Sequence, residues 1–445
     1  MKIELISHAS ILITCGETQI LTDPWYISKG FNNSWALLGT KQLSEDELKG
    51  INYIWISHEH PDHFNVPTLR SFPDWFKKQV TILFQTKNSE KLFTAMKNWG
   101  FEKFQSLANQ TMISLDSETQ IYCYPTHLGD SCLGVRYQGQ SLFNINDAEL
   151  NEDDCNTILK DFGDVDVIAN QFSLAGYLGF ANYQEILPKM AEDKLDRLAN
   201  NHRHLRADLT IPFASFVYFA TVDNRFMNQY ANTPETVTRY MAQKNLRTHF
   251  MELGEVFDLE NQELHDRGLN YWQDKFRNID KLDFSESEVI DYERIETAAL
   301  EFTEKLYKYY PRPMVWMIRP LKIYIPDLQL LVRYAPKDRI FHLIEANTTD
   351  AEADLVIYSQ PLWYGFNFNW GFETLAVSSR IIVKNNYFMW KLVKNLSILM
   401  NQEIYLKPKY LREKETRGYL RERFSNGLAS QIIFKSMSNM KLSRG

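Results

Sequence analysis

One short segment, Ser57–His63, constrains this chain more than any other. Its sequence, Ser-His-Glu-His-Pro-Asp-His, directly follows the apolar run Tyr53–Ile56. An aromatic and β-branched run that stops at a polar cluster with a proline is typical of a buried strand that ends in a tight loop. Three imidazoles and a carboxylate supply the nitrogen and oxygen ligands that first-row transition metals bind. The segment therefore predicts a metal site at the C-terminal edge of a strand.

The spacing within this loop indicates how its side chains are used. His58 and His60 are two residues apart on an extended segment, so both side chains point to the same side. Pro61 then bends the chain, and Asp62 and His63 face a second position. The alternative is a polar loop that holds its histidines by chance, but with 10 histidines in 445 residues this pattern arises at a rate on the order of a few in ten thousand. We therefore predict two adjacent metal ions.

Composition narrows the class of protein. A chain of 445 residues that is 44% hydrophobic can form two or three globular domains. No apolar run approaches the length that crosses a bilayer, and Met1–Leu5 lacks the apolar core of a signal peptide, so we expect a cytoplasmic protein without a transmembrane segment. The four cysteines form no Cys-x-x-Cys pair, which argues against a disulfide framework, a zinc ribbon or a Rieske iron–sulfur centre in this chain.

Charge is spread unevenly along the chain. The formal net charge of −7 is opposite to the excess of positive charge typical of proteins that bind nucleic acids, so we expect no nucleic-acid partner. From Ile404 to the end, however, ten Lys or Arg face three Glu, a net of 10 − 3 = +7. This basic tail either contacts phosphates or acidic lipid, or is a solvated terminal face.

Metal-binding residue types recur at the ends of other predicted strands, namely at Asp23, His127 and Asp147. Such convergence is what a shared site at a sheet edge requires. Pro24 favours an extended Asp23, whose carboxylate can then lie beside the metal loop and orient a ligand imidazole. The alternative for Asp23 is an ordinary turn at the end of a strand.

Three regions follow from the pattern of elements. Strands and helices alternate over residues 1–225, which predicts an α/β domain with two sheets between layers of helices. Residues 226–300 are polar and helix-forming, which predicts a helical connector. Residues 301–445 mix apolar strands with helices, which predicts a C-terminal α+β region that carries the basic tail.

A His-x-His-x-Asp-His loop after a strand, a later lone His and a later strand-end Asp together resemble the metallo-β-lactamase superfamily, whose fold is an αββα sandwich. The resemblance implies two ligand groups that share one carboxylate: His58, His60 and His127 for the first metal, Asp62 and His63 for the second, and Asp147 between them.

The opening of the chain resembles one branch of that superfamily. His8-Ala9-Ser10 and Thr22–Trp25 are similar to the branch of CMP-N-acetylneuraminate hydroxylase and ascorbate-6-phosphate lactonase. Two departures stand out. Most hydrolases of the superfamily supply one more His to the second metal after the last strand, whereas residues 212–216 read Pro-Phe-Ala-Ser-Phe, and His202 and His204 could substitute only by an unusual path. The hydroxylase also carries a Rieske domain, for which this chain has no ligand set.

The resemblance and the missing His together favour oxidation. A second position with two oxygens and one nitrogen suits iron and dioxygen. We therefore expect two divalent transition metals, iron rather than zinc or manganese, in an O2-dependent di-iron hydroxylase. Its substrate would be a small polar molecule, nucleotide- or sugar-linked by likeness, and its electrons would come from a separate ferredoxin or reductase.

Two alternatives remain open at this stage. One is a hydrolase of a phosphoester or lactone, in which the metals activate water, Asp62 or Asp147 orients the hydroxide, and His8 contacts the leaving group. The other is a metal-binding scaffold without catalysis, although its signature, disrupted ligands, is largely missing here.

Overall fold

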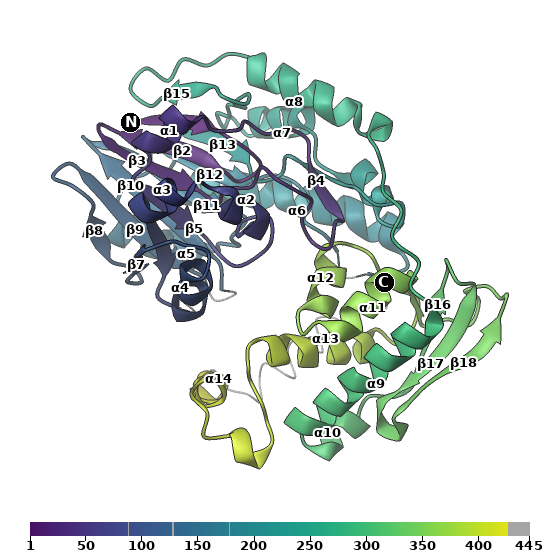
Figure 1. The fold of residues 1–445 in the computed structure, drawn as a ribbon. Helices are drawn as coiled ribbons and strands as arrows, with labels where there is room; N and C mark the ends of the chain where they lie inside the picture. The colour runs from purple at the N-terminus through teal and green to yellow at the C-terminus, as the bar shows by residue number, and fades with distance from the viewer. Residues whose placement is uncertain (88, 127–128, 178, 426–445) are drawn as a thin grey trace. The chain divides into compact units, whose positions relative to one another are not determined.

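The chain divides into two compact units in a computed structural model that describes residues 1–425 except 88, 127, 128 and 178 (Figure 1). The first unit comprises residues 1–177 and 182–286, and the second comprises residues 178–181 and those from 287 onward. Each unit buries apolar side chains of its own.

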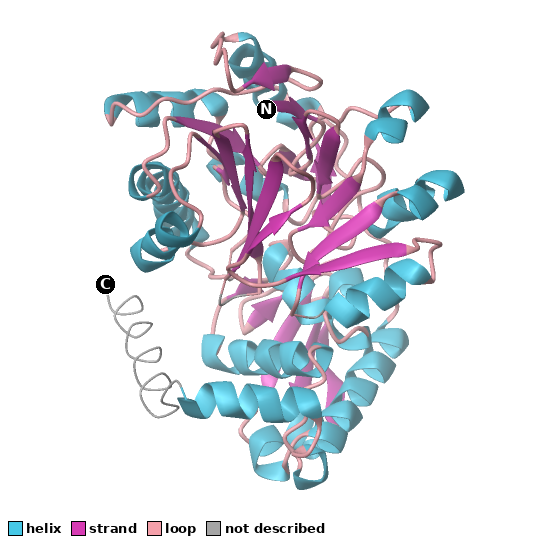
Figure 2. Cartoon of the chain, turned by 90° about the vertical axis from the view of Figure 1, so that its left-hand side faces the viewer, coloured by secondary structure: helices cyan, strands magenta, loops and turns pink. Residues whose placement is uncertain are grey.

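Two β-sheets form the centre of the first unit (Figure 2). Among the described residues, the first sheet has the strand order β15-β1-β2-β3-β5-β6-β7 and the second β13-β12-β11-β10-β9-β8. The strands of the first sheet are β1 (Lys2–Leu5), β2 (Ile11–Cys15), β3 (Thr18–Thr22), β5 (Tyr53–Ile56), β6 (Thr81–Gln85), β7 (Lys103–Leu107) and β15 (Val256–Asp258). Those of the second are β8 (Met112–Ser114), β9 (Thr119–Pro125), β10 (Ser131–Tyr137), β11 (Gln140–Asn146), β12 (Val167–Gln171) and β13 (Leu209–Phe213). A separate pair consists of β4 (Trp35–Leu37) and β14 (Val217–Phe219).

Helices cover the outer faces of both sheets. The first sheet packs against side chains of four helices, and the second against Cys155 and Ile158 of the fifth, while Ile13 and Val135 meet in the core between the sheets. These helices are α1 (Glu45–Gly50), α2 (Val66–Ser71), α3 (Asp74–Gln79), α4 (Ser89–Lys97) and α5 (Glu152–Asp161). Capping boxes at Ser44 and Asn151 start α1 and α5. The layers confirm the predicted αββα sandwich.

The strand directions bring four strand ends to one edge of the sandwich. β3 runs parallel to β5 in the first sheet, and β11 runs parallel to β12 in the second. Parallel strands end at the same edge of a sheet. The residues that follow these strands therefore define where the site lies.

Residues 226–286 differ from the connector that the sequence predicts over 226–300. They comprise mainly two helices and β15, which extends the first sheet beside β1. Met241, Phe250 and Trp272 are buried in the core between the sheets. Because these side chains help to close that core, the segment is part of the first unit, and the boundary falls at 286/287. The helices that complete this unit are α6 (Tyr183–His204), α7 (Pro234–Gln243) and α8 (Arg267–Arg277), with a 3-10 helix at Arg225–Tyr230.

The second unit combines helices with one sheet. Among the described residues its sheet has the strand order β18-β17-β16-β19-β20. The strands are β16 (Leu321–Ile325), β17 (Leu330–Ala335), β18 (Ile340–Ala346), β19 (Leu355–Val356) and β20 (Ile382–Val383). The helices are α9 (Tyr292–Tyr309), α10 (Arg312–Trp316), α11 (Ser359–Asn367), α12 (Gly371–Val377), α13 (Tyr387–Asn401) and α14 (Lys414–Ser425). The predicted α+β character of the C-terminal region is confirmed, and Trp363–Phe372 contributes Phe366 and Phe372 to its core.

Among the described residues, no helix combines the length and the apolar character that spanning a membrane requires.

Candidate metal centre

The loop Ser57–His63 leaves the end of β5 and is fixed by short-range hydrogen bonds. The backbone N–H groups of His63 and Phe64 both donate to the His60 carbonyl, at 3.0 and 2.7 Å. Asn65 caps α2 by accepting from the Thr68 N–H, and its amide donates to the Pro61 carbonyl at 3.1 Å. The loop is therefore the tight turn that the sequence predicts, and it is tied to the start of α2.

A buried carboxylate, Asp23, holds the base of this loop. Its Oδ1 accepts from the Ser57 N–H at 2.8 Å, and its Oδ2 accepts from the Ser57 hydroxyl at 2.7 Å. The same Oδ2 accepts from the Asn146 amide at 2.5 Å and lies 2.9 Å from His63 Nδ1. Asp23 is fully buried. It therefore occupies the place beside the metal loop that the sequence predicts.

The backbone of Asp23 corrects one detail of that prediction. Asp23 has a φ of +37°, not the extended conformation that Pro24 favours, and Asn146 has a φ of +62°. Non-glycine residues in this region carry strain of about 1–3 kcal/mol, which the surrounding contacts must offset. At Asn146 the turn coincides with an irregularity in the pairing of β11 with β12. Both strained residues aim a polar side chain at the same buried cluster.

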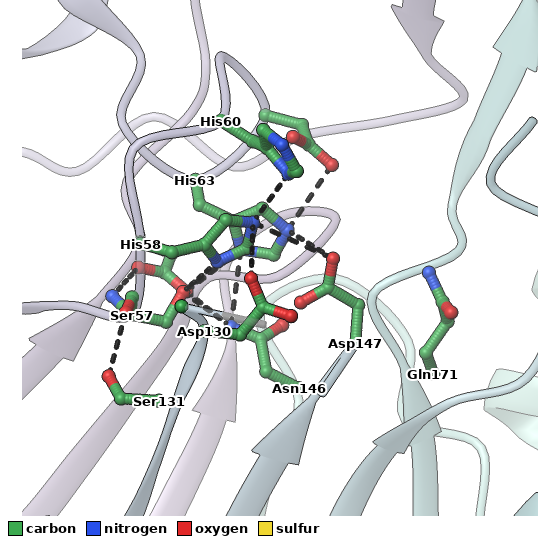
Figure 3. Close-up of polar contacts among 12 residues, drawn as sticks. Ser57, His58, His60, His63, Asp130, Ser131, Asn146, Asp147 and Gln171 are labelled. Atoms are coloured by element: carbon green, nitrogen blue, oxygen red, sulfur yellow. Dashed lines mark hydrogen bonds and ion pairs between the residues drawn. The ribbon is translucent and has the colours of Figure 1, made fainter. Parts of the chain in front are cut away.

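This network selects the tautomers of two histidines (Figure 3). Since the Ser57 hydroxyl proton points to Asp23, the Ser57 oxygen accepts from His58 Nδ1, at 3.0 Å. His63 Nδ1 donates to Asp23. In both rings Nδ1 is therefore the atom that bonds to the protein, and Nε2 faces the other side, where its lone pair is available to a metal once Nε2 carries no proton.

The first group of ligand atoms lies around His58. Its Nε2 is 2.8 Å from His60 Nδ1, 3.7 Å from Asp147 Oδ2 and 3.9 Å from Asp130 Oδ1. His127, the third imidazole that the resemblance implies, lies outside the described residues. Asp130, in contrast, is near enough to take part.

The second group lies around His63. Its Nε2 is 3.2 Å from Asp62 Oδ2 and 3.5 Å from Asp147 Oδ2. His8 approaches from the turn between β1 and β2, and its Nε2 is 3.4 Å from Asp62 Oδ2. Asp147 thus lies between His58 and His63, near both groups. In each of two sets, three ligand atoms lie within 4.8 Å of one another. One set belongs to His58, His63 and Asp147, and the other to His8, Asp62 and His63.

Unpartnered buried atoms show that a cation fits here. Within the described part of the chain, five buried atoms of this cluster have no hydrogen-bond partner: both ring nitrogens of His8, Nε2 of His63, and one oxygen each of Asp62 and Asp147. Leaving a buried polar group unpaired costs about 1–3 kcal/mol, and more when it is charged. Inward-facing imidazole and carboxylate lone pairs are what a divalent transition metal would satisfy.

The charges of the cluster affect its pKa values. Burial lowers the pKa values of His8 and His58 below the ordinary histidine value. Burial alone would also lower the pKa of His63, but the carboxylates of Asp62 and Asp147 outweigh it and raise that pKa well above its usual value. Burial opposes ionisation of Asp62, yet His63 and His8 hold its pKa well below the usual range. The imidazole of His63 and the neighbouring carboxylates therefore each favour the charged form of the other.

Among the described residues, His202 and Arg136 lie away from the cluster. His202 Nδ1 bonds the Thr210 hydroxyl at 2.8 Å, near the start of β13 and so away from the edge where the ligands meet. Arg136 donates to the carbonyls of Phe162 and Asp164 on the outer side of the second sheet. The sequence reasoning missed Ser57 and Asn146, whose only signal was their position at the ends of β5 and β11.

An αββα sandwich with a His-x-His-x-Asp-His loop at its shared edge defines a protein of the metallo-β-lactamase fold. The comparisons agree, because residues 2–151 match the family model described as "Beta-lactamase superfamily domain". Residues 2–151 of the first unit are thus similar to a domain of this superfamily.

Named relatives match parts of the chain. A Mycolicibacterium smegmatis protein named as a Rieske 2Fe-2S iron–sulfur protein is 28% identical over 182 residues, which cover 39% of this chain and 34% of that protein. Cytidine monophosphate-N-acetylneuraminic acid hydroxylase of Asterias rubens is 39% identical over 70 residues, which cover 16% of this chain and 11% of the hydroxylase. The matches thus span about a third or less of the length of these two relatives.

The similar solved structures include proteins named for two different reactions, hydrolysis and hydroxylation. A possible metal-dependent hydrolase from Veillonella parvula has a TM-score of 0.42 at 16% identity and covers 58% of this chain and 98% of that one. CmlA, a diiron β-hydroxylase from Streptomyces venezuelae, has a TM-score of 0.40 at 14% identity and covers 57% of this chain and 53% of that one. Scores this low do not bear on which reaction the present chain performs.

Proposed function

We propose that the first unit is a metal-dependent enzyme with a dinuclear centre, and that it is an O2-dependent di-iron hydroxylase of a small polar substrate. The proposed ligands are the six that the resemblance implies: His58, His60, His127, Asp62, His63 and Asp147. Asp23 is proposed as the carboxylate that orients His63 and, through Ser57, His58. When bound, the two irons would supply the activation of dioxygen.

The observation that carries this proposal is the pair of neighbouring ligand groups linked by Asp147. Asp147 Oδ2 lies 3.7 Å from His58 Nε2 and 3.5 Å from His63 Nε2. Together with Asp62 and Asp130, it makes the cluster rich in carboxylates. Oxygen-rich surroundings with some imidazole suit iron, whereas structural zinc sites favour Cys and His.

The exposure of the ligands indicates how a substrate would reach them. His8, Asp62 and His63 are buried, whereas the side chains of Asp130 and Asp147 are 18% and 17% exposed. A polar substrate would therefore arrive from the side of these two aspartates. The pKa of Asp147 is lowered by His58 and His63 against the effect of burial, so this carboxylate is ionised and able to accept a hydrogen bond or a proton.

The relatives' names support oxidation and an electron-transfer partner. Two of the matched proteins are named as a hydroxylase and as a Rieske iron–sulfur protein. A hydroxylation that uses dioxygen consumes two electrons from outside, and the four cysteines of this chain are all free and buried. We propose a separate ferredoxin or reductase as their source.

Metal analysis tests the proposal. The protein is expressed in iron-rich medium, purified without chelators, and assayed for iron and zinc per chain. We expect about two irons per wild-type chain, and an absorbance change when reductant and then dioxygen are added. Asp147→Ala should lose at least one iron. Asp166→Ala is the matched control, since Asp166 also accepts from a serine at a strand but lies away from the cluster.

The opposite outcomes are equally specific. Two zincs, with turnover of a phosphodiester or lactone and no dependence on dioxygen, would replace the hydroxylase with the hydrolase. A wild-type chain that holds no metal after anaerobic reconstitution with Fe²⁺, Zn²⁺ or Mn²⁺ would overturn both.

A further inference from the structure

His8 is held rigidly at the tip of the turn that joins β1 to β2. The N–H groups of Ile6 and Ser7 both donate to the Ser10 carbonyl, at 2.9 and 3.1 Å, and the Ser7 hydroxyl donates to the Trp25 carbonyl at 2.6 Å. The His8 side chain is only 1% exposed. A side chain fixed in this way is pre-organised for a single role.

The His8 ring has no hydrogen-bond partner among the residues that the structure describes. Both Nδ1 and Nε2 are buried and unpaired. Trp25 packs edge-on against the ring, with centroids 5.6 Å apart, and occupies none of its lone pairs or N–H groups. The distance of 3.4 Å from Nε2 to Asp62 Oδ2 is long for a hydrogen bond to a carboxylate, which is typically about 2.7–2.9 Å. Something outside the described side chains must therefore satisfy this imidazole.

The distances around Asp62 fit a shared cation. Asp62 Oδ2 lies 3.4 Å from His8 Nε2 and 3.2 Å from His63 Nε2. Ligand atoms about 2.1 Å from one metal are separated by about 3.0–3.4 Å in octahedral or tetrahedral geometry. The ligand nitrogens of His8 and His63, the third pair in this set, also lie within 4.8 Å of each other.

His8 lies close to the segment in which most hydrolases of the superfamily carry one more histidine for the second metal. That segment, residues 212–216, has no histidine. The N–H of Ala214, which has a φ of +52°, donates to the His8 carbonyl at 2.6 Å. The β1–β2 turn thus lies directly against the segment from which the missing ligand would come.

We propose that His8 is a direct ligand of the second metal and takes the place of the histidine missing from residues 212–216. The inference rests on the proposed dinuclear function and replaces the expected contact between His8 and a leaving group. It gives the second metal His8, His63 and Asp62, in addition to Asp147. This set of two histidines and two carboxylates, with further positions open, includes the two-histidine, one-carboxylate combination typical of iron(II) oxygenases, which points to iron at this position.

Metal stoichiometry tests the inference without an activity assay. Wild type, His8→Ala, His8→Gln and His202→Ala are reconstituted anaerobically with Fe²⁺, dialysed and assayed for iron per chain. His202→Ala removes another buried histidine of the same unit. We expect two irons for wild type and His202→Ala but one for both His8 variants, with the affinity of the second iron reduced by more than about 100-fold, beyond the 10–100-fold typical of residues that only orient a ligand.

Chemical rescue separates ligation from packing. Millimolar free imidazole should restore the second iron in His8→Ala, because the vacated volume admits the ring, and should not do so in Asp147→Ala. If His8→Ala fails to fold by circular dichroism, His8→Gln, which fills the space with a weak ligand, decides the question. A folded His8 variant that keeps two irons with wild-type affinity would overturn the inference and leave the proposed function standing. A wild type that binds fewer than two metals would overturn both.

Discussion

Replacing Asp23 by Asn tests how the network beneath the ligands controls metal binding. The substitution keeps the size of the side chain but places an NH2 group where Oδ2 now accepts from three donors: the Ser57 hydroxyl, the Asn146 amide and His63 Nδ1. Ser57 and Asn146 can reorient to present an acceptor. His63 can do so only by moving its proton from Nδ1 to Nε2, which removes the lone pair proposed to bind the second metal.

The expected magnitude follows from the cost of reversing that change. To bind the metal, His63 of Asp23→Asn must return to the tautomer in which its Nδ1–H faces an N–H group, and an unpaired buried donor costs about 1–3 kcal/mol. At about 1.4 kcal/mol for each factor of ten, the affinity of the second metal should fall about 5- to 150-fold. This range agrees with the 10–100-fold typical of partners that orient a ligand.

Isothermal titration calorimetry with Fe²⁺ or Zn²⁺ under anaerobic conditions measures this effect. Asp166→Asn is the matched control, because Asp166 Oδ2 accepts from the N–H and the hydroxyl of Ser141, at 2.6 and 3.0 Å, without a histidine in the network. We expect Asp166→Asn to bind both metals like wild type. A folded Asp23→Asn that binds the second metal with wild-type affinity would refute the argument from the tautomer.

Three further predictions address pH, metal removal and packing. Asp62 and Asp147 hold the pKa of His63 well above its usual value against the effect of burial, so a metal that binds at pH 7 must displace a proton. Calorimetry in buffers of different ionisation enthalpy should therefore show proton release, and the metal affinity should rise with pH until that pKa is passed. Binding that does not depend on pH would contradict this. Metal at 100 times its dissociation constant should stabilise the first unit by about 2.7 kcal/mol. The unfolding temperature of the unit should rise by several degrees, and EDTA should reverse the rise. An unchanged unfolding temperature would argue against a site that exists only in the folded state. Gly268→Ala should destabilise the first unit by about 1–3 kcal/mol in chemical denaturation, because the added Cβ would lie 1.9 Å from the Phe250 carbonyl oxygen. Gly418→Ala is the control, since a Cβ there would have nothing within 4 Å. If Gly268→Ala were as stable as wild type, α8 would not pack as described.

The ligand loop could be predicted from the sequence because its information is local. His58, His60, Asp62 and His63 lie within one turn, and the apolar run before them fixes where the strand ends. The same reasoning placed Asp23 and Asp147 at strand ends, since a polar residue after an apolar run is also a local signal. The αββα class followed from the order of these elements together with the family resemblance.

The segment 226–286 shows what local patterns leave open. The helical period identifies an apolar stripe on α8, made by Gly268, Trp272 and Phe276, but not the core against which it packs. Polar residues on its other face suggested a connector. The packing of Trp272 against Phe216, with ring centroids 3.8 Å apart, assigns α8 to the first unit, and no local pattern specifies that contact.

The sequence by itself determined that imidazoles and carboxylates are present at strand ends, in the order that a metal site of this superfamily uses. Only the tertiary structure brought Asn146 to Asp23 across 123 residues, and His8 to the segment around Ala214. The physical reason is that hydrogen bonds and metal ligation depend on distances of about 2–4 Å, which sequence spacing specifies within one turn but not between strands of two different sheets.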